Sequence, residues 1–383
     1  MNMRSIDILE RGIENVLPSK EKFAELMDSK KISIYLGIDP TSSDLHLGHL
    51  VSLLILKRFK EAGHKVVIVI GGFTARIGDP SDKDAARKPM TEDQINENAK
   101  TYEKQIERIL GDVEYKNNAD WLKKLTFEDV LKLSAKVTVQ QMLERDMFQK
   151  RLKDEKPIGV HEFMYPLMQG YDSVAMEIDA EIGGSDQLFN MMVGRDLEKM
   201  YLNKEKFVVT TKLLADPEVE SKMSASEGPY VSLNAKPEEL FGAVMALSDG
   251  IVSSCFELCT EVPMEEIDKL KSEHPRDVKA RLAFEIIKLI YGEDKAKKAK
   301  EEFEKVFKEG GVPEEMEEFK VEGSKKIVDV LIESGLVESK SEARRLIAGK
   351  GVVLDDEVIE DWDTEVSSGK VLKVGKHRFI KIT

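Results

Sequence analysis

The fold of this chain is decided by one stretch near its start, KISIYLGIDPTSSDLHLGHLVSLLILKRFKEAGHKVVIVIGGF, residues 31–73. Two short apolar runs, 31–38 and 65–73, enclose a segment whose apolar residues recur at helical spacing. The pattern predicts a strand, a helix and a second strand. Both strands are apolar throughout rather than at alternate positions, which is typical of a parallel sheet covered on both faces. We therefore predict an α/β fold with a doubly wound parallel sheet.

The remainder of this sheet is expected further along the chain. Strand-like runs follow at 174–184 and 206–214, whereas the region from about 76 to 160 is mainly helical and charged. This order indicates a helical insertion between the two halves of a Rossmann-like sheet. We expect the domain that contains the sheet to span residues 1–232.

An all-helical domain is predicted at residues 233–310. Pro275 suits a first helical position, and the residues after it repeat at helical spacing. The apolar stripe consists of Val278, Leu282, Ile286 and Leu289. Residues 311–323, which contain glycines, a proline and clustered acids, indicate a linker.

The last sixty residues, 324–383, have as many basic as acidic residues, although the whole chain has a net charge of −14. The basic residues gather at Arg344, Arg345 and Lys350, apart from the acidic ones. A capping box at 339–342 predicts a short helix, and a strand-like run follows it. We predict a small α+β domain that binds RNA; a solvated, charged tail domain is the alternative that these features leave open.

Composition excludes several classes of protein. A net charge of −14 excludes bulk electrostatic binding of nucleic acid, so any RNA contact must be local. Cys255 and Cys259 lie one helical turn apart without a second pair, so we expect buried thiols and no protein-bound metal site. The apolar runs fall short of the roughly 18 residues of a membrane span, and the first residues do not resemble a signal peptide. A cytoplasmic protein is expected.

Two histidines, His46 and His49, come where the first strand ends and the helix begins. Backbone N–H groups and the positive end of the helix dipole face one point there, which favours phosphate as the ligand. Gly48 between them would let a ligand approach the backbone, and no third metal ligand is evident nearby. From the spacing alone, two incidental histidines at a helix start explain the pattern equally well.

A second motif favours the phosphate interpretation. SKMSAS, residues 221–226, follows a predicted strand and offers a lysine and hydroxyls on a loop. Two phosphate-binding elements on opposite halves of one sheet suit a site for a triphosphate.

These motifs, HLGH and KMSAS, resemble the two signatures of the class I aminoacyl-tRNA synthetases. Longer matches resemble the bacterial tyrosyl-tRNA synthetase family within that class, over essentially the whole chain. They are YLGIDPT (35–41), GDPS (78–81), YPLMQGYDSV (165–174) and IGGSDQ (182–187). The resemblance implies an enzyme that joins L-tyrosine to its tRNA through a tyrosyl-adenylate. It also implies ATP as a substrate together with Mg²⁺, and a homodimer formed through the insertion, near residues 137–148.

The resemblance also implies roles for individual residues. It assigns catalytic contacts with the phosphates to Thr41, His46, His49, Lys83, Arg87 and Lys222. It assigns tyrosine binding to Tyr35, Asp39, Asp79, Tyr165, Gln169, Asp172 and Gln187, with Tyr35 and Asp172 at the phenol. It assigns binding of the remainder of the ATP molecule to Gly37, Gly48, Gly184 and Asp186, with Asp186 accepting from a ribose hydroxyl.

One residue departs from the family pattern, because Ala225 stands where the signature loop usually has a second lysine. The departure leaves open an RNA-binding protein that has lost amino-acid activation. A nucleotidyltransferase would also use HxGH at a strand–helix junction, but it would not explain the C-terminal domain. A tryptophan enzyme is a nearer relative, although the context of Asp172 favours tyrosine.

Overall fold

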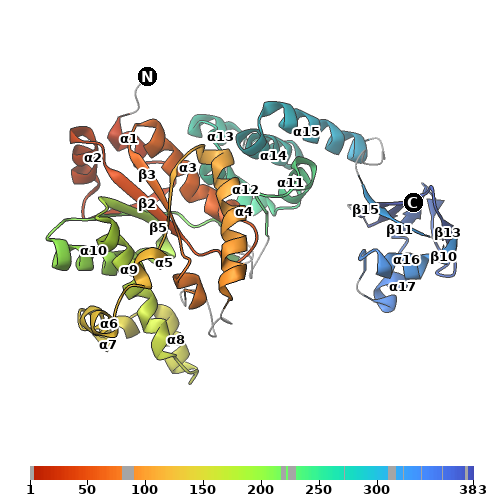
Figure 1. The fold of residues 1–383 in the computed structure, drawn as a ribbon. Helices are drawn as coiled ribbons and strands as arrows, with labels where there is room; N and C mark the ends of the chain where they lie inside the picture. Colours follow the sequence, from red (N-terminus) through yellow and green to blue (C-terminus); the bar gives the residue numbers. More distant parts are fainter. Residues whose placement is uncertain are drawn as a thin grey trace. The chain divides into compact units, whose positions relative to one another are not determined.

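The computed structural model describes residues 4–79, 90–216, 221–222, 230–270, 272–308, 316–321, 323–337, 339–355, 357–375 and 378–383 (Figure 1). The chain forms two units, residues 1–296 and 297–383. No helix among the described residues is long and apolar enough to cross a membrane.

The first unit is built on a six-stranded sheet. Its strands are β1 (Ile13–Leu17), β2 (Ser33–Ile38), β3 (Lys65–Ile70), β4 (Glu114–Asn117), β5 (Ala180–Gly184) and β6 (Phe207–Thr211). They lie in the order β1-β6-β5-β2-β3-β4, and every neighbouring pair is parallel except β1 and β6. The predicted doubly wound parallel sheet is confirmed. The antiparallel edge strand β1 escaped prediction because Glu14 and Asn15 interrupt its apolar run.

The strand order reverses between β2 and β5, and the two strands pair only at their first residues. Ile34 pairs with Ala180 and Tyr35 with Glu181, and no pairing of β2 with β5 extends beyond these residues. In open α/β sheets, ligands bind outside the carboxyl ends of the strands at such a reversal. The register therefore leaves an opening between residues 36–38 of β2 and 182–184 of β5.

Helices cover both faces of the sheet. The helix α3 (Leu47–Glu61) joins β2 to β3, and α10 (Leu188–Leu202) joins β5 to β6 in the opposite direction along the sheet. Because such crossovers are right-handed, α3 and α10 lie on opposite faces. The predicted helix after β2 is confirmed; its residues Leu50, Leu53, Leu54 and Phe59 are all buried. The helix α9 (Met164–Met176) packs against α10 (Figure 1).

The region expected as a helical insertion is mainly helical, but it also supplies β4 to the sheet edge. Its helices are α4 (Glu92–Leu110), α5 (Ala119–Leu122), α6 (Phe127–Ser134), α7 (Val139–Leu143) and α8 (Asp146–Lys153). The expected strand at 174–184 was wrong in its first half, since Val174 belongs to α9. The chain leaves that helix at Glu177, which is left-handed with φ of 51°, and β5 begins only at Ala180.

Helices also fill the region after the sheet. They are α11 (Pro237–Met245), α12 (Asp249–Cys259), α13 (Met264–Leu270), α14 (Pro275–Tyr291) and α15 (Glu293–Lys308). Pro275 opens α14 as expected, and its stripe is buried except for Leu289, which is half-buried. Gly292, with φ of 92°, separates α14 from α15. Cys255 and Cys259 are buried free thiols, as expected.

The second unit has its own hydrophobic core and an α+β fold, as predicted. Its five-stranded sheet contains β12 (Glu357–Val358), β11 (Val352–Leu354), β14 (Val371–Val374), β15 (Arg378–Ile382) and β9 (Glu317–Phe319), in that order. Its other elements are β10 (Ser324–Lys326), paired with β13 (Glu365–Ser367), and the helices α16 (Ile327–Glu333) and α17 (Lys340–Ala348). The Ser339 side chain caps α17 as predicted. Residues 317–319, expected as part of a linker, form β9 because they pair with β15.

The smaller elements complete the chain. They are α1 (Ser5–Ile8), α2 (Lys20–Ser29), the 3-10 turns Thr74–Arg76, Val160–Phe163 and Ser185–Gln187, and the paired strands β7 (Ala215–Asp216) and β8 (Ser221–Lys222).

Candidate active site

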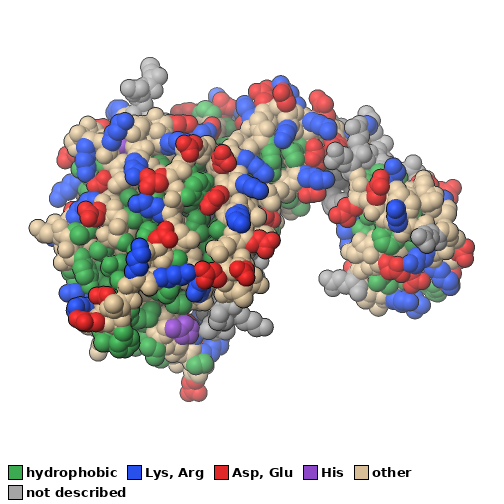
Figure 2. All heavy atoms as spheres, in the orientation of Figure 1, with side chains coloured by type: hydrophobic (Ala, Val, Ile, Leu, Met, Phe, Trp, Pro, Cys, Tyr) green, Lys and Arg blue, Asp and Glu red, His purple; other side chains and the backbone are tan. Residues whose placement is uncertain are grey.

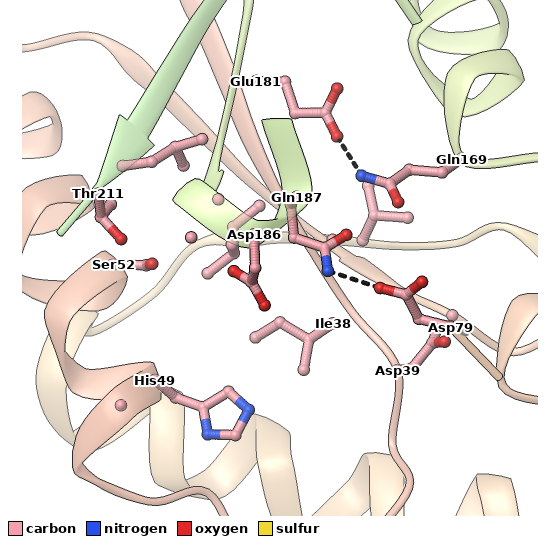
Figure 3. Close-up of a pocket in the computed structure, with 18 of the residues that line it drawn as sticks. Ile38, Asp39, His49, Ser52, Asp79, Gln169, Glu181, Asp186, Gln187 and Thr211 are labelled. Carbon is pink, nitrogen blue, oxygen red and sulfur yellow. Dashed lines mark hydrogen bonds between the residues drawn. The ribbon is translucent and has the colours of Figure 1, made fainter. Parts of the chain in front are cut away.

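A cavity of about 330 Å³ opens at the carboxyl ends of β2 and β5 (Figure 3). Among the residues singled out in the sequence, those that line it are Gly37, Asp39, Thr41, His46, Gly48, His49, Asp79, Tyr165, Gln169, Asp172, Gly184, Asp186 and Gln187. The fold thus brings residues of five recognised segments, YLGIDPT, HLGH, GDPS, YPLMQGYDSV and IGGSDQ, to one place, whereas most of KMSAS lies outside the described residues.

The remaining expected residues are placed differently. Tyr35 is fully buried beside the cavity rather than among its lining residues, and its hydroxyl lies 3.0 Å from the Ser173 hydroxyl. The backbone of Lys222 is in β8 and pairs with Ala215. The side chain of Lys222, together with Lys83, Arg87 and Ala225, lies outside the described residues.

His46 and His49 together cap the start of α3. The backbone N–H of Gly48 donates to Nδ1 of His46 at 3.1 Å, and the backbone N–H of His46 donates to Nδ1 of His49 at 3.2 Å. The two ring centroids are 4.1 Å apart. Because each Nδ1 atom accepts a hydrogen bond, the ring proton of each neutral imidazole sits on Nε2. Each histidine can therefore donate one hydrogen bond from Nε2 to a ligand.

Burial keeps both imidazoles neutral. It lowers the pKa of His46 to about 4. It also lowers the pKa of His49 well below its ordinary value, with a smaller contribution from His46. At neutral pH the pair therefore presents hydrogen-bond donors without full positive charge.

The segment that follows the SKMSAS loop is attached to the start of α3. Asp44 accepts from Ser232 at 3.2 Å and from Asn234 at 3.0 Å, and the Tyr230 hydroxyl donates to the carbonyl of Asp44 at 3.2 Å. Ser232 also pairs with His46 in an antiparallel bridge. Residues 230–234 are therefore fixed beside the two histidines.

Two carboxylates that line the cavity, those of Asp39 and Asp79, accept hydrogen bonds from neighbouring side chains. The Tyr165 hydroxyl donates to Oδ2 of Asp39 at 2.8 Å, and Thr74 donates to the other oxygen at 2.6 Å. The Gln187 amide donates to Oδ2 of Asp79 at 2.5 Å (Figure 3). Asp79 also lies 3.8 Å from the Arg145 guanidinium, and the Gln187 oxygen accepts from Asn190 at 2.9 Å. Because each carboxylate oxygen has two lone pairs, Asp39 and Asp79 can still accept from a cationic group.

A third acidic side chain that lines the cavity, that of Asp172, comes from α9. Trp121 Nε1 donates to its Oδ1 at 2.7 Å, and Asn118 Nδ2 donates to its Oδ2 at 3.2 Å. Burial raises the pKa of Asp172 well above its ordinary value, while these two hydrogen bonds act to lower it. A buried carboxyl group held by two donors is a suitable partner for a ligand hydroxyl.

Sequence reasoning missed several residues of this site. They are Thr74, Asn118, Trp121, Ser173, Glu181 and Lys206. Asn118 directly follows β4, so recognising that strand would have placed it at the carboxyl edge of the sheet. No cluster of three histidine, cysteine or acidic side chains that could hold a metal ion occurs in the described part of the chain.

The basic residues expected to bind RNA lie on the second unit. Arg344 and Arg345 are exposed on α17, and the Arg344 guanidinium lies 5.6 Å from the ring centre of Trp362. Lys350 is exposed and pairs with Glu360 at 2.8 Å. Two of the three cations therefore lie side by side on one short helix.

The fold and the capped histidine pair are those of a class I aminoacyl-tRNA synthetase. Residues 27–308 match the family described as tRNA synthetases class I (W and Y). Residues 302–381 match the tyrosine–tRNA ligase SYY-like C-terminal domain.

Whole-chain relatives narrow this class. The chain is 43% identical to the tyrosine–tRNA ligase of Thermotoga maritima, over 99% of this chain and 97% of that protein. It is also 43% identical to that of Carboxydothermus hydrogenoformans, with the same coverage. A C-terminally truncated mitochondrial tyrosyl-tRNA synthetase from Aspergillus nidulans shares the fold, with a TM-score of 0.66 and 24% identity over 79% of this chain and 94% of that one. The chain belongs to the tyrosine–tRNA ligase family.

Proposed function

We propose that this chain activates L-tyrosine with ATP and transfers it to the 3′ end of its tRNA. The observation that carries the proposal is the convergence, in one cavity, of the donor pair His46 and His49 with the buried carboxyl group of Asp172. In the first step the tyrosine carboxylate attacks the α-phosphorus of ATP, and the bond to the bridging oxygen breaks to release pyrophosphate. In the second step a ribose hydroxyl of the tRNA attacks the acyl carbon and AMP leaves.

The histidines act on the triphosphate, which enters with Mg²⁺. Their Nε2–H groups donate to phosphate oxygens as charge develops there. The backbone N–H groups of Leu47, Gly48 and His49 already donate to Val231 and His46, so the start of α3 contributes through its helix dipole rather than through direct hydrogen bonds. Thr41 lies beside them, and Lys222, Lys83 and Arg87 hold the departing pyrophosphate. Gly37, Gly48 and Gly184 leave room for adenosine, and Asp186 accepts from a ribose hydroxyl. Neither step forms a covalent bond to the enzyme, so positioning and charge stabilisation supply the catalysis.

The carboxylates select the amino acid. Asp172 accepts from the phenol, with Tyr35 nearby, and Asp79, Tyr165 and Gln169 surround the ammonium. Asp39 and Gln187 lie near the reacting carboxylate. Phenylalanine lacks the hydroxyl, so it would remove the phenol hydrogen bond from the buried Asp172 group and leave only the bonds from Trp121 and Asn118, which costs free energy.

The tRNA contacts are assigned outside the sheet domain. We place the catalytic domain at residues 1–232, a helical domain on the anticodon side at 233–310 and an RNA-binding domain at 324–383, with Arg344, Arg345 and Lys350 as phosphate contacts. The segregated charge of the last domain supports this, since the whole chain is acidic. ATP, tRNA and ribosomes meet in the cytoplasm, which is the proposed place of action.

A homodimer completes the proposal. Phe127 and Leu131 on α6 and Val139 on α7 are 77%, 54% and 59% exposed. Figure 2 shows hydrophobic side chains gathered over this part of the molecule. Contiguous exposed apolar surface of this kind marks interaction sites, and a second copy is the proposed partner.

The test is pyrophosphate exchange into ATP, measured in parallel with tyrosine, phenylalanine and tryptophan. Exchange that depends on tyrosine alone is expected. Exchange with tryptophan would reassign the amino acid. Exchange that needs no amino acid would favour a nucleotidyltransferase, and RNA binding without any exchange would favour an inactive RNA-binding protein.

A further inference from the structure

A buried ion pair reaches the cavity wall, where its acidic member Glu181 is a lining residue, and neither member has a role in the mechanism proposed above. Glu181 on β5 and Lys206, one residue before β6, are 1% and 0% exposed and form a salt bridge between Lys206 Nζ and Glu181 Oε2. The other carboxylate oxygen, Oε1, accepts from Nε2 of Gln169 at 2.9 Å (Figure 3). Lys206 also donates to the Ser173 hydroxyl at 2.7 Å. The pair therefore connects β5 and β6 to two residues on one face of α9.

The helix packing makes room for the lysine. A Cβ atom on Gly194 of α10 would lie 2.5 Å from Lys206 Nζ and 3.1 Å from the Ser173 hydroxyl oxygen. A Cβ on Gly170 of α9 would lie 3.1 Å from the Cα of Gly194. Two glycines thus allow the helices to approach closely and leave a space for the ammonium group. Burying two charges in this way is costly unless they are paired and hydrogen-bonded, which they are here.

The direction of the hydrogen bonds follows from the two charged groups of the pair. An ammonium group can only donate, and a carboxylate can only accept. Glu181 therefore accepts from both Lys206 and Gln169, which turns the amide nitrogen of Gln169 toward Glu181. The amide oxygen of Gln169 is then left on the other side, as Figure 3 shows. An oxygen at that place can accept from a ligand ammonium, whereas an amide nitrogen would repel it.

We propose that Glu181 and Lys206 are positioning residues that hold the Gln169 amide with its oxygen toward the tyrosine ammonium. This inference rests on the proposed function, since it requires tyrosine in the cavity. The pair acts through Gln169, so it selects for a free ammonium group on the substrate.

The substitution Glu181→Gln tests the direction. Lys206 still requires an acceptor, so the new amide must turn its oxygen to Lys206 and its nitrogen to Gln169. Gln169 must then accept, which turns its own nitrogen toward the ligand. Tyrosine binding, measured by calorimetry, should weaken by about 10- to 100-fold, as for a lost charge-assisted hydrogen bond. Binding of 3-(4-hydroxyphenyl)propanoate, which lacks the ammonium, should change little.

Adding Lys206→Met removes the group that dictates the direction. The amide at position 181 can then turn its oxygen to Gln169, so the double variant should recover most of the tyrosine affinity. The double variant has no buried charge at either position. If Glu181→Gln alone does not fold, the double variant can therefore be used to test the proposal instead. Its tyrosine affinity is then compared with that of Gln169→Ala, and an equal loss would overturn the proposal. Glu205→Gln is the matched control, since Glu205 pairs with Arg195 at the surface.

The other outcomes are distinct. Unchanged tyrosine binding in Glu181→Gln, or equal weakening for tyrosine and the analogue, would overturn the positioning role. A double variant as weak as the single one would show that the carboxylate contacts the ammonium directly. If the unsubstituted chain binds no tyrosine, the proposed function itself fails.

Discussion

The backbone N–H of His46 donates to Nδ1 of His49 at 3.2 Å, so the second histidine closes the helix start that the first one caps. Each imidazole thereby has one nitrogen bound to the helix and the other available to a ligand. Local structure and chemistry are coupled at this point, because the same hydrogen bonds that stabilise α3 fix the tautomer that can donate to phosphate.

Replacing the histidines should slow tyrosine activation. His49→Ala removes a donor whose bond to ATP strengthens as charge develops, so the rate of adenylate formation should fall by about 10²-fold or more. His46→Asn should have a similar effect, although asparagine retains an acceptor for the helix cap. Single-turnover measurements of adenylate formation give these rates. The tyrosine dissociation constant should change little; equal losses in tyrosine affinity and rate would show that the histidines only support the fold.

Acid should destabilise the protein through His46. Its pKa is about 4 in the folded chain against an ordinary 6.5, so between these values the unfolded chain binds more protons. The free energy of unfolding therefore falls as pH drops through this window, by about 2 kcal/mol from this group between pH 7.5 and 5. His46→Asn should lose this component, which denaturant unfolding of both proteins at the two pH values measures. If the free energy of unfolding of His46→Asn fell with pH as much as that of the unsubstituted chain, the prediction would be contradicted.

YLGIDPT and IGGSDQ could be placed from sequence because each overlaps a continuous apolar run, and HLGH because it opens the helical pattern that comes after the first of these runs. HLGH follows β2 and IGGSDQ ends β5, so a doubly wound order brings both to the same edge. Asp172 and Gln169 follow only from the resemblance to a family, since the apolar pattern around Val174, in the same helix, predicts a strand. Short apolar runs do not distinguish a buried helix from a buried strand.

Lys206 and Glu181 could not be found in this way. A lysine just before a strand is ordinary at a surface, and its burial depends on Gly194, twelve positions away on another element. Asn118 and Trp121 were missed because β4, with the sequence EYKN, has no apolar run to announce it. Polar contacts between distant elements follow from the packing, which local patterns do not determine.

Removing residues 316–383 should separate the two activities. The deletion begins before β9, because β9 pairs with β15 and would otherwise lose its partner. This unit has a hydrophobic core of its own, so the catalytic unit should keep its fold and its tyrosine-dependent pyrophosphate exchange. Charging of tRNA should be lost. Loss of both activities would make these residues part of the catalytic body, and unchanged charging would exclude an RNA role.

Smaller changes test the same surface in the full chain. Arg344→Gln, Arg345→Gln and Lys350→Gln together should weaken tRNA binding and make it less sensitive to salt. Each lost phosphate contact should reduce the slope of log K against log salt by about 0.7 to 0.9. Lys340→Gln, which removes a positive charge from the same helix but outside the proposed set of phosphate contacts, is the matched control. An unchanged salt slope would place the tRNA contacts elsewhere.

Ala225 should limit the rate of activation. It lies outside the described residues, but the bacterial family that the sequence resembles usually has a lysine there, and Lys222 supplies the other ammonium group of the loop. A charge-assisted hydrogen bond contributes about 1.5 to 3 kcal/mol, so its absence slows activation by about 10- to 100-fold unless Lys83 and Arg87 compensate. Ala225→Lys should therefore speed adenylate formation by up to this factor, and Lys222→Ala should slow it by more. The tyrosine dissociation constant should stay the same, because the loop acts on the leaving group. Single-turnover rates of adenylate formation by the unsubstituted chain, Ala225→Lys and Lys222→Ala test this prediction. Equal rates with alanine and lysine at position 225 would mean that other residues already replace the missing charge. Lys83→Ala and Arg87→Ala should then slow adenylate formation.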